Sequence, residues 1–319
     1  MIQAPKHKTR KPTTMTIGRT LLLMALGAGL LATAPVSAQE KEDRVLQGRA
    51  KFYNNLKPNS LEDVTPRRTL LASLKAQNIS PSKIWKVLEH GEKVECLACI
   101  PYVSKLLYSS EAKNREISAW WLRRRIFGVF GPGQTYSQVL EKLKSGSDNE
   151  RAYAADAVGE FLNPSGVKHV ALAAVSDASP AVRKSAVKAL ERLNQQGPEA
   201  ELGKALEDAD VGVKMAALHA AGRVNVFSSV DKVVALLGDD SPDVRKRAAE
   251  TLGSMRVGDA VVGLIALAGS GEESDDVRAA AIWALGQIGD SEARPTVQAQ
   301  AKSPSDIVRS AAAVALLRL

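Results

Sequence analysis

The chain of 319 residues has few of the side chains on which most enzyme sites depend: two cysteines, four histidines and only 4% aromatic residues. It contains neither a glycine-rich phosphate-binding loop nor a Gly-x-Ser-x-Gly nucleophile motif. Apart from His7 near the start, the histidines His90, His169 and His219 are far apart in the sequence. A metal site needs several suitable ligands at one place. The sequence therefore predicts no metal centre, no cofactor and no catalytic residue.

The two cysteines, Cys96 and Cys99, form the motif Cys-Leu-Ala-Cys. A c-type haem attachment motif would need histidine at the next position, which is Ile100. Two thiols are too few for a structural zinc site unless His90 and a carboxylate join them. Three states stay open: a disulfide, which an oxidising compartment favours; two buried thiols on a packed helix; or a redox-active or metal-binding pair.

Residues 1–38 have the order of a secretory signal peptide. Basic residues come first, an apolar run extends from Leu21 to Ala32, and small residues lead to Ala38. We expect cleavage after Ala38 and export to a bacterial periplasm. The alternative is an uncleaved segment that tethers the protein to a membrane, although the apolar run is short for a hydrocarbon core of ~30 Å.

The net charge gives little support to a nucleic-acid partner. The whole chain carries +8, but residues 1–38 hold five basic residues and no acidic ones, which leaves about +3 for the remainder. Most of the basic excess therefore belongs to the predicted leader. Together with export, this distribution predicts that the partner is not a nucleic acid.

Residues 39–92 form a polar leader and a helical N-terminal region without a clear repeat. Ser80-Pro81 favours a helix start, because proline at the first helical position needs no N–H partner. His90-Gly91 favours the end of that helix. A repeat array is predicted to follow over residues 93–319.

In this array one phrase recurs: a turn residue, Val-Arg, two small apolar residues, then Ala-Leu-Gly. Its basic residue, which we call the anchor, returns every 31 to 33 residues. The anchors are Arg151, Arg183, Lys214, Arg245, Arg278 and Arg309. A fixed period of this length is typical of stacked helix-turn-helix units that bury their apolar faces only against one another. The sequence predicts an all-α solenoid, an α-α superhelix of about six or seven repeats, best defined over 145–319.

Two segments carry a resemblance to a known family. Ser-Pro-Asp-Val-Arg-Lys-Arg-Ala-Ala-Glu-Thr-Leu-Gly at 241–253 and Asp-Asp-Val-Arg-Ala-Ala-Ala-Ile-Trp-Ala-Leu-Gly at 275–286 resemble HEAT repeats. The most similar type is the short bacterial form, the phycobilisome-lyase HEAT-like repeat. The resemblance implies a stack that binds partners along its inner surface. The family also includes enzymes. Deoxyhypusine hydroxylases hold a di-iron centre at repeated His-Glu dipeptides, and bilin lyases act on chromophores. No His-Glu dipeptide occurs here, and no residues identify a chromophore pocket.

The copies depart from the phrase at a few positions. Lys214 replaces the arginine, Ala221 replaces the leucine, and Arg123 and Glu191 replace the glycine. These departures leave the predicted fold intact. They indicate that the repeats have individual surfaces.

The anchors invite a catalytic interpretation, because Arg183 follows Asp177 by six residues and Lys214 follows Asp208 by the same step. Catalytic residues are usually single copies, whereas this combination recurs with the period. We expect instead that each anchor binds groups in its turn and ties adjacent repeats together through charge-assisted hydrogen bonds.

One position inside the phrase does not repeat. A looser copy of the phrase lies around 94–128, with Arg115 at the anchor position. Five residues after Arg115 and the six anchors come Trp120, Asp156, Lys188, His219, Glu250, Trp283 and Val314. One helical turn later come Arg124, Glu160, Arg192, Arg223, Ser254, Gln287 and Arg318. We call these two positions the variable column, because they lie between positions that are small or apolar in most copies. They are predicted to line the inner surface where solenoids bind; the alternative is a row of ordinary solvated positions.

The densest cluster beside the variable column is Trp120-Trp121 with the basic run 123–125. Tryptophan is enriched at the energetic centres of interfaces, so this cluster favours a binding role. The alternative interpretation places Trp121 in the core and the basic residues on the solvent-exposed side of the helix.

The sequence as a whole predicts a non-catalytic scaffold or adaptor outside the cytoplasm, which binds a protein partner through its inner face. A peptide, a protein loop or an acidic glycan would suit the exposed part of the cluster formed by Trp120-Trp121 and the basic run 123–125. The alternative is an enzyme or enzyme accessory, acting by redox chemistry at Cys96 and Cys99 or by a lyase or oxidoreductase activity of the family. Apolar residues of the last helix, Ala311, Val314 and Leu317, suggest contact with a second copy of the chain.

Overall fold

A computed structural model describes residues 67–76, 79–92, 96–128 and 131–319. Within these ranges sixteen α-helices follow one another as pairs joined by short turns. The all-α solenoid predicted from the 31- to 33-residue period is confirmed. The predicted signal peptide, residues 1–38, lies outside the described residues, as does the polar leader that follows it.

Each pair consists of an odd-numbered and an even-numbered helix. The first four pairs are α3 (Arg67–Lys75) with α4 (Pro81–His90), α5 (Ile100–Leu106) with α6 (Ala112–Arg123), α7 (Gln134–Ser145) with α8 (Asp148–Phe161), and α9 (Val167–Ser176) with α10 (Pro180–Leu193). The next four are α11 (Glu199–Ala205) with α12 (Val211–Ala221), α13 (Val230–Ala235) with α14 (Pro242–Met255), α15 (Val261–Gly269) with α16 (Asp275–Ile288), and α17 (Arg294–Gln300) with α18 (Asp306–Leu316).

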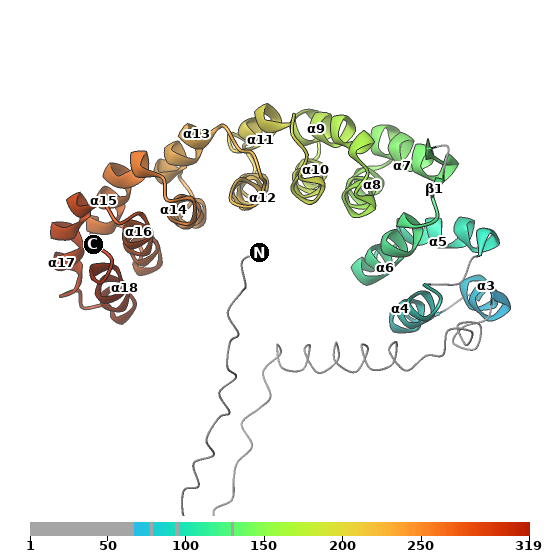
Figure 1. The fold of residues 1–319 in the computed structure, drawn as a ribbon, viewed down its shortest axis with the longest axis horizontal. Coiled ribbons are helices and arrows are strands. Elements are labelled where there is room, and N and C mark those ends of the chain that lie inside the picture. Colours follow the sequence, from blue (N-terminus) through green and yellow to red (C-terminus); the bar gives the residue numbers. More distant parts are fainter. Residues whose placement is uncertain (1–66, 77–78, 93–95, 129–130) are drawn as a thin grey trace, which may run out of the picture. The chain divides into compact units, whose positions relative to one another are not determined.

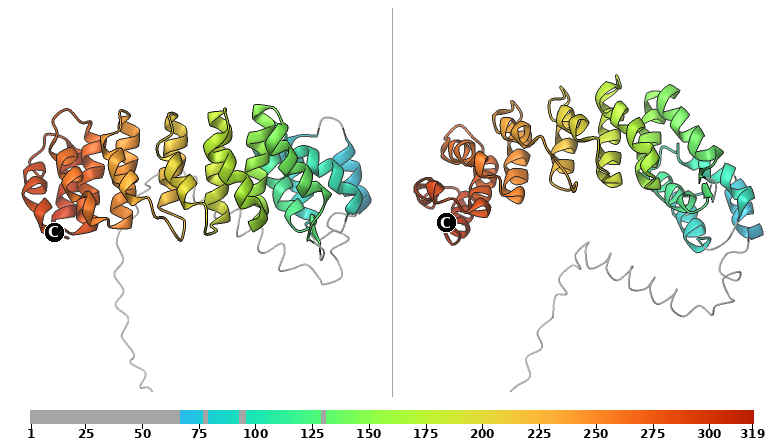
Figure 2. Two further views of the ribbon diagram at one scale, coloured as in Figure 1. Left: turned by 90° about the horizontal axis from the view of Figure 1, so that it is seen from above. Right: turned by 45° about the horizontal axis from the view of Figure 1, so that its top comes forward.

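The helices form two layers, with the odd-numbered helices in one and the even-numbered helices in the other (Figures 1 and 2). Each even-numbered helix packs on its own odd-numbered partner and on the even-numbered helix of the next pair. We call the exposed side of the even-numbered layer the inner face. Between α6 and α7, a two-residue strand β1 (Phe127–Gly128) pairs antiparallel with β2 (Gly131–Pro132).

The even-numbered helices begin where the turn residues predict. Helices α4, α10 and α14 each start at a proline that follows a serine, so the missing N–H falls in the first turn where no helical acceptor exists. The predicted start at Ser80-Pro81 and stop at Gly91 are confirmed for α4. In α8 and α16, the N-caps Ser147 and Ser274 accept a backbone N–H instead.

The glycine of the phrase allows adjacent even-numbered helices to touch. A Cβ atom added to Gly159 on α8 would lie 2.8 Å from the Cα of Ala189 on α10. The same contact joins Gly286 on α16 to Ala315 on α18, again at 2.8 Å. Because only glycine fits at such a distance, this position fixes how closely two repeats pack.

The pair α3 and α4 extends the stack, although the sequence over 39–92 shows no clear repeat. Helix α4 packs on α6, as later even-numbered helices pack on their neighbours. The fully buried Trp121 of α6 donates its Nε1–H to the carbonyl oxygen of Gly91 at 3.1 Å. Arg125 stacks on the Trp121 ring at 3.7 Å and donates to the carbonyl of Glu92.

The anchors hold the turns of their own repeat. Arg183 donates from Nη1 to the carbonyl oxygens of Asp177 at 2.8 Å and Ala178 at 3.2 Å. Arg245 and Arg309 make the same two backbone contacts in their own turns. These bonds satisfy carbonyl groups in the turns that precede α10, α14 and α18.

The same anchors also reach the next repeat. Arg183 binds the carboxylate of Asp208 through Nε at 2.6 Å and Nη2 at 2.8 Å. We call the set of such contacts the anchor ladder. Its members are Arg151–Asp177, Arg183–Asp208, Lys214–Asp239 and Arg245–Glu273, followed by Arg278 with the neutral Gln300. Both kinds of expected hydrogen bond are therefore present, but the carboxylate belongs to the following repeat.

The ladder aspartates are held as carboxylates. Burial opposes the charge on Asp177, Asp208 and Asp239, but an anchor side chain and a backbone N–H two residues onward both donate to each carboxylate. The hydrogen bonds outweigh the burial and lower the pKa of all three below its usual value. The lowered pKa links the stability of the stack to pH.

We predict that Arg183→Met destabilises the protein. The substitution removes two turn hydrogen bonds and leaves Asp208, whose side chain is only 10% exposed, without its cation. The expected loss is on the order of 3 kcal/mol, measured by denaturant unfolding. As a control, Lys232→Ala breaks an ion pair in which Glu207 is 60% exposed, and should cost less than about 1 kcal/mol. Equal effects of the two changes would contradict a structural ladder.

We also predict acid destabilisation through the ladder. A carboxylate with a lowered pKa in the folded state stabilises the fold above its unfolded pKa, about 4, and loses that contribution as pH falls through the folded value. Asp208→Asn should therefore lower the unfolding temperature at pH 7 and converge with the wild type near pH 2. The exposed neighbour of a ladder residue, Asp240, supplies the control Asp240→Asn. If the unfolding temperature of Asp208→Asn still fell with decreasing pH as steeply as that of the wild type, this mechanism would be contradicted.

Candidate functional site

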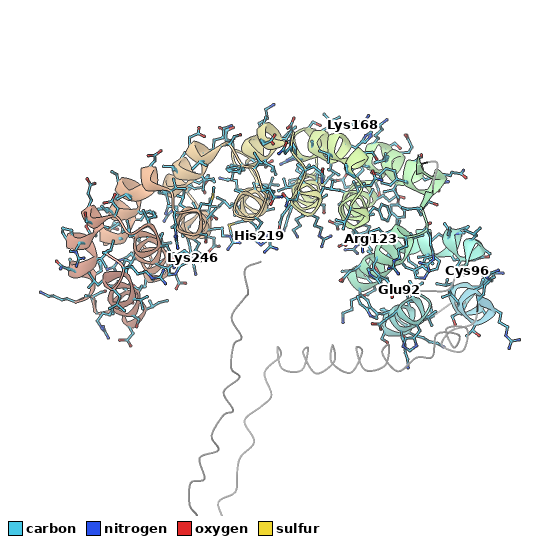
Figure 3. All side chains as sticks on the ribbon, in the orientation of Figure 1. Glu92, Cys96, Arg123, Lys168, His219 and Lys246 are labelled. Atoms are coloured by element: carbon cyan, nitrogen blue, oxygen red, sulfur yellow. A yellow bond between two sulfur atoms is a disulfide. The ribbon has the colours of Figure 1, made fainter. Side chains whose placement is uncertain are left out.

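The variable column lies on the even-numbered helices and lines three successive grooves of the inner face. His219 on α12 and Lys246 on α14 lie on this side of the stack, whereas Lys168 lies on the odd-numbered layer (Figure 3). The first groove takes Asp156, Glu160, Lys188 and Arg192 from the column, the second Lys188, His219 and Glu250, and the third Trp283, Gln287, Val314 and Arg318. The structure thus places ten of the fourteen residues of the column in these grooves.

The first groove, between α6, α8 and α10, has a volume of about 180 Å³ and a network of charges. Arg115 lies over the ring of Tyr153 at 3.9 Å. Glu160 pairs with Arg192 of the next repeat. Burial raises the pKa of both Asp156 and Glu160, against the opposing effect of nearby cations. The acidic and basic side chains of this groove therefore partly neutralise one another.

The second groove is larger, about 680 Å³, and runs over α12 between α10 and α14. Its floor is the first half of α12, with Val211 and Met215. Lysines line both sides, Lys184 and Lys188 on α10 and Lys246 on α14. The same walls also carry the carboxylates Glu191, Asp243 and Glu250, so the groove combines an apolar floor with walls of mixed charge.

The third groove, about 310 Å³, lies between α16 and α18 and is mainly apolar. Trp283 forms one side and is 37% exposed, and Ile307 and Val314 are 49% and 53% exposed. At one end Arg318 donates to Gln287 at 2.5 Å. An exposed tryptophan ring beside branched apolar side chains is typical of an interface hot spot.

Four residues of the column lie outside these grooves: Trp120, Arg124, Arg223 and Ser254. Trp120 is half-buried against the core. Arg124 and Arg223 are exposed and pair with Glu92 and Glu191, each on the preceding even-numbered helix or its end. The position nine residues after the anchor therefore contributes a second set of contacts between repeats, in addition to the anchor ladder. Its ion pairs are Glu92–Arg124, Glu160–Arg192 and Glu191–Arg223.

The tryptophan and arginine cluster on α6 divides between two roles. Trp121 and Arg125 are structural, because they bind the carbonyls at the end of α4. Arg124 remains on the surface, 62% exposed, in a pair with Glu92. The cluster therefore contributes less free surface than its composition predicts.

Cys96 and Cys99 form a disulfide at the 3-10 turn that precedes α5. Both residues are fully buried. Thiol–disulfide exchange requires an attacking thiolate to reach a sulfur atom. The folded protein therefore offers no direct access to this bond.

Several groove residues were missed by the sequence analysis: Lys184, Met215, Lys246 and, in the first groove, Glu116. Each of them follows its anchor, or Arg115 in the looser first copy, by one residue. That position lies one helical turn before the variable column on the same side of the helix. Extending the column backwards by four residues would have found them.

Within the ranges that the structure describes, no three histidine, cysteine or acidic side chains gather closely enough to hold a metal ion. No helix of those ranges is long and apolar enough to cross a membrane.

The stacked helix pairs and their ladder define the class of the protein, an α-solenoid. The sequence model for HEAT repeats matches residues 199–273 and 262–319. Residues 199–319 are thus HEAT repeats, and the predicted resemblance is confirmed over these residues. No curated protein matches the sequence.

Solved structures with the same architecture include YibA of Escherichia coli, at 19% identity and a TM-score of 0.54, covering 87% of this chain and 97% of YibA. Importin β matches at 12% identity and a TM-score of 0.57, over 88% of this chain and 44% of importin β. Kap95p, solved with RanGDP, matches at 13% identity and a TM-score of 0.56, over 89% of this chain and 43% of Kap95p. At these identities the likeness establishes the fold alone.

Proposed function

We propose that this HEAT-repeat protein is a non-catalytic scaffold that binds a protein partner along its inner face. One observation carries the proposal: the half-exposed Trp283 and its apolar groove lie on a face that is otherwise charged. Solvent exposure of a tryptophan next to Ile307 and Val314 costs free energy that a partner's apolar side chain would recover.

The fold supports this proposal by analogy. Kap95p, a solenoid of the same architecture, is described in its structure as binding RanGDP. HEAT-type stacks present one long surface made of many similar helices, and variation at single positions adapts it to a partner. In this chain such variation is concentrated in the variable column.

The competing proposal, an enzyme that uses Cys96 and Cys99, has less support. A redox dithiol has to be reached by its substrate, and both cysteines are fully buried in the disulfide. The groove with raised carboxyl pKa values, at Asp156 and Glu160, holds these groups against cations from neighbouring helices rather than around an open reaction site.

We further propose that the protein acts outside the cytoplasm after removal of residues 1–38. The disulfide supports this location, because such bonds persist in oxidising compartments. Association with a second copy through Val314 and Leu317, which is 87% exposed, stays a prediction that light scattering would check.

We predict that Trp283→Ala weakens binding of the physiological partner at least tenfold, the effect of losing one interface hot spot. The partner would be captured on the tagged protein, identified, purified and measured by calorimetry. Val262→Ala is the matched control, because Val262 is 74% exposed on α15 in the odd-numbered layer. Unchanged affinity in Trp283→Ala and in Val314→Asp, with both variants folded, would contradict binding at this groove.

Export generates a separate prediction. N-terminal sequencing of the protein recovered from the periplasm should begin at Gln39, and Cys96 and Cys99 should resist alkylation until the protein is unfolded and reduced. Retention of Met1 would instead indicate a tethered protein. If both thiols reacted after unfolding without reductant, the protein would contain no disulfide.

A further inference from the structure

The inner layer is opened at α12, where the close glycine contact between repeats is lost on both sides. On α10, Glu191 occupies the position at which α8, α14 and α16 have the glycine that touches the next helix. A side chain at this position prevents the approach seen where glycine meets alanine. On the other side, a Cβ atom at Gly222 would lie 3.7 Å from Thr251 of α14, an ordinary contact.

This opening creates the groove of about 680 Å³ over α12. Its floor exposes apolar surface, since Val211 is 42% exposed and Met215 is half-buried beside it. Lys184 points toward that floor: its Nζ atom lies 3.6 Å from the place where a Cβ of Gly212 would be. Gly212 therefore leaves room for the ammonium group inside the groove.

The carboxylates of the groove are largely engaged. Glu191 binds Arg223 at 2.8 Å and His219 at 2.8 Å, and Glu250 binds Arg247 at 3.2 Å. Asp243 lies in the first turn of α14, where the helix dipole favours a negative charge.

The lysines of the walls are less engaged. Within the described part of the chain, Lys184 and Lys188 form no ion pair. Lys246 approaches Asp276 only to 3.6 Å, with side chains 38% and 61% exposed, and such surface pairs exchange readily for another anion. The groove therefore presents cations on both walls that a negatively charged ligand would meet.

We propose that the groove over α12 binds an acidic segment of the partner protein, in which carboxylates flank one apolar side chain. The apolar side chain covers Val211 and Met215, while the carboxylates meet Lys184 on one wall and Lys246 on the other. A peptide fits better than a nucleic acid, because single-stranded nucleic acids rely on aromatic stacking and this groove has no Phe, Tyr or Trp in its lining. This inference rests on the proposed scaffold function and names the chemistry of its ligand.

The test uses the full chain and a fluorescent peptide with one leucine flanked by three glutamates on each side. Anisotropy should show saturable binding that weakens with added salt, because exposed charges are screened. A peptide with lysine in place of glutamate, and one with serine in place of leucine, should each bind at least tenfold more weakly. These two peptides separate the charge requirement from the apolar requirement.

The variant Lys184→Glu with Lys246→Glu reverses one charge on each wall and should weaken binding of the glutamate peptide more than tenfold. Its matched control, Lys168→Glu with Lys204→Glu, changes the net charge equally on helices α9 and α11 of the odd-numbered layer. The control should stay within twofold of wild type. Circular dichroism melting confirms that both variants are folded.

The proposal is overturned if the glutamate peptide binds no better than the lysine peptide, or if both charge-reversal variants lose binding equally. It is also overturned if a single-stranded oligonucleotide of equal charge displaces the peptide at equal concentration. If peptide binding fails while the purified partner still requires Trp283, only this inference falls. If the partner requires neither groove, the inner-face function falls as well.

Discussion

The bond between an anchor and the aspartate of the next repeat is the constraint on which the rest of the stack depends. One residue such as Asp177 is used three times: its carboxylate accepts from Arg151, the same carboxylate caps the turn at Ser179, and its backbone carbonyl accepts from Arg183. The turns at Asp177 and Asp239 are each fixed in this way by two successive anchors. A shift of one repeat against another would leave a buried carboxylate and a buried guanidinium without partners, at a cost of several kcal/mol.

The ladder holds the turns at one end of the even-numbered helices. The spacing between these helices is set by the glycine that meets alanine, as at Gly253 and Ala284, where a Cβ would lie 2.7 Å from the alanine Cα. The ladder fixes register and the glycine fixes distance. The variable column can then change in charge without disturbing either, whereas the groove over α12 owes its width to the loss of the close glycine contact.

The period alone predicted the all-α solenoid and the repeated helix pairs, since period and small-residue spacing are local properties. It did not predict which carboxylate each anchor binds: Asp177 is six residues from Arg183 but its carboxylate pairs with Arg151, 26 residues away. The pair α3 and α4 carries no recognisable phrase, because Ile84, buried in the core, stands where a Ser-Pro alignment places the anchor. Contacts across repeats, unlike the repeats themselves, have no signature in one sequence.

The departures from the phrase were nevertheless visible, and their physical meaning follows from the structure. Replacing glycine by Glu191 forfeits the closest packing available to α10 and α12, so it stabilises nothing by itself. Its carboxylate is then held by Arg223 and His219, both on or just beyond α12, which keeps the widened seam ordered. Because these ion pairs hold the wider contact between α10 and α12 in place, the groove keeps its shape without a ligand. Such preorganisation reduces the entropy lost on binding. At Glu191 the sequence thus gives up close packing at the groove to which we assign, by proposal, the recognition of a partner.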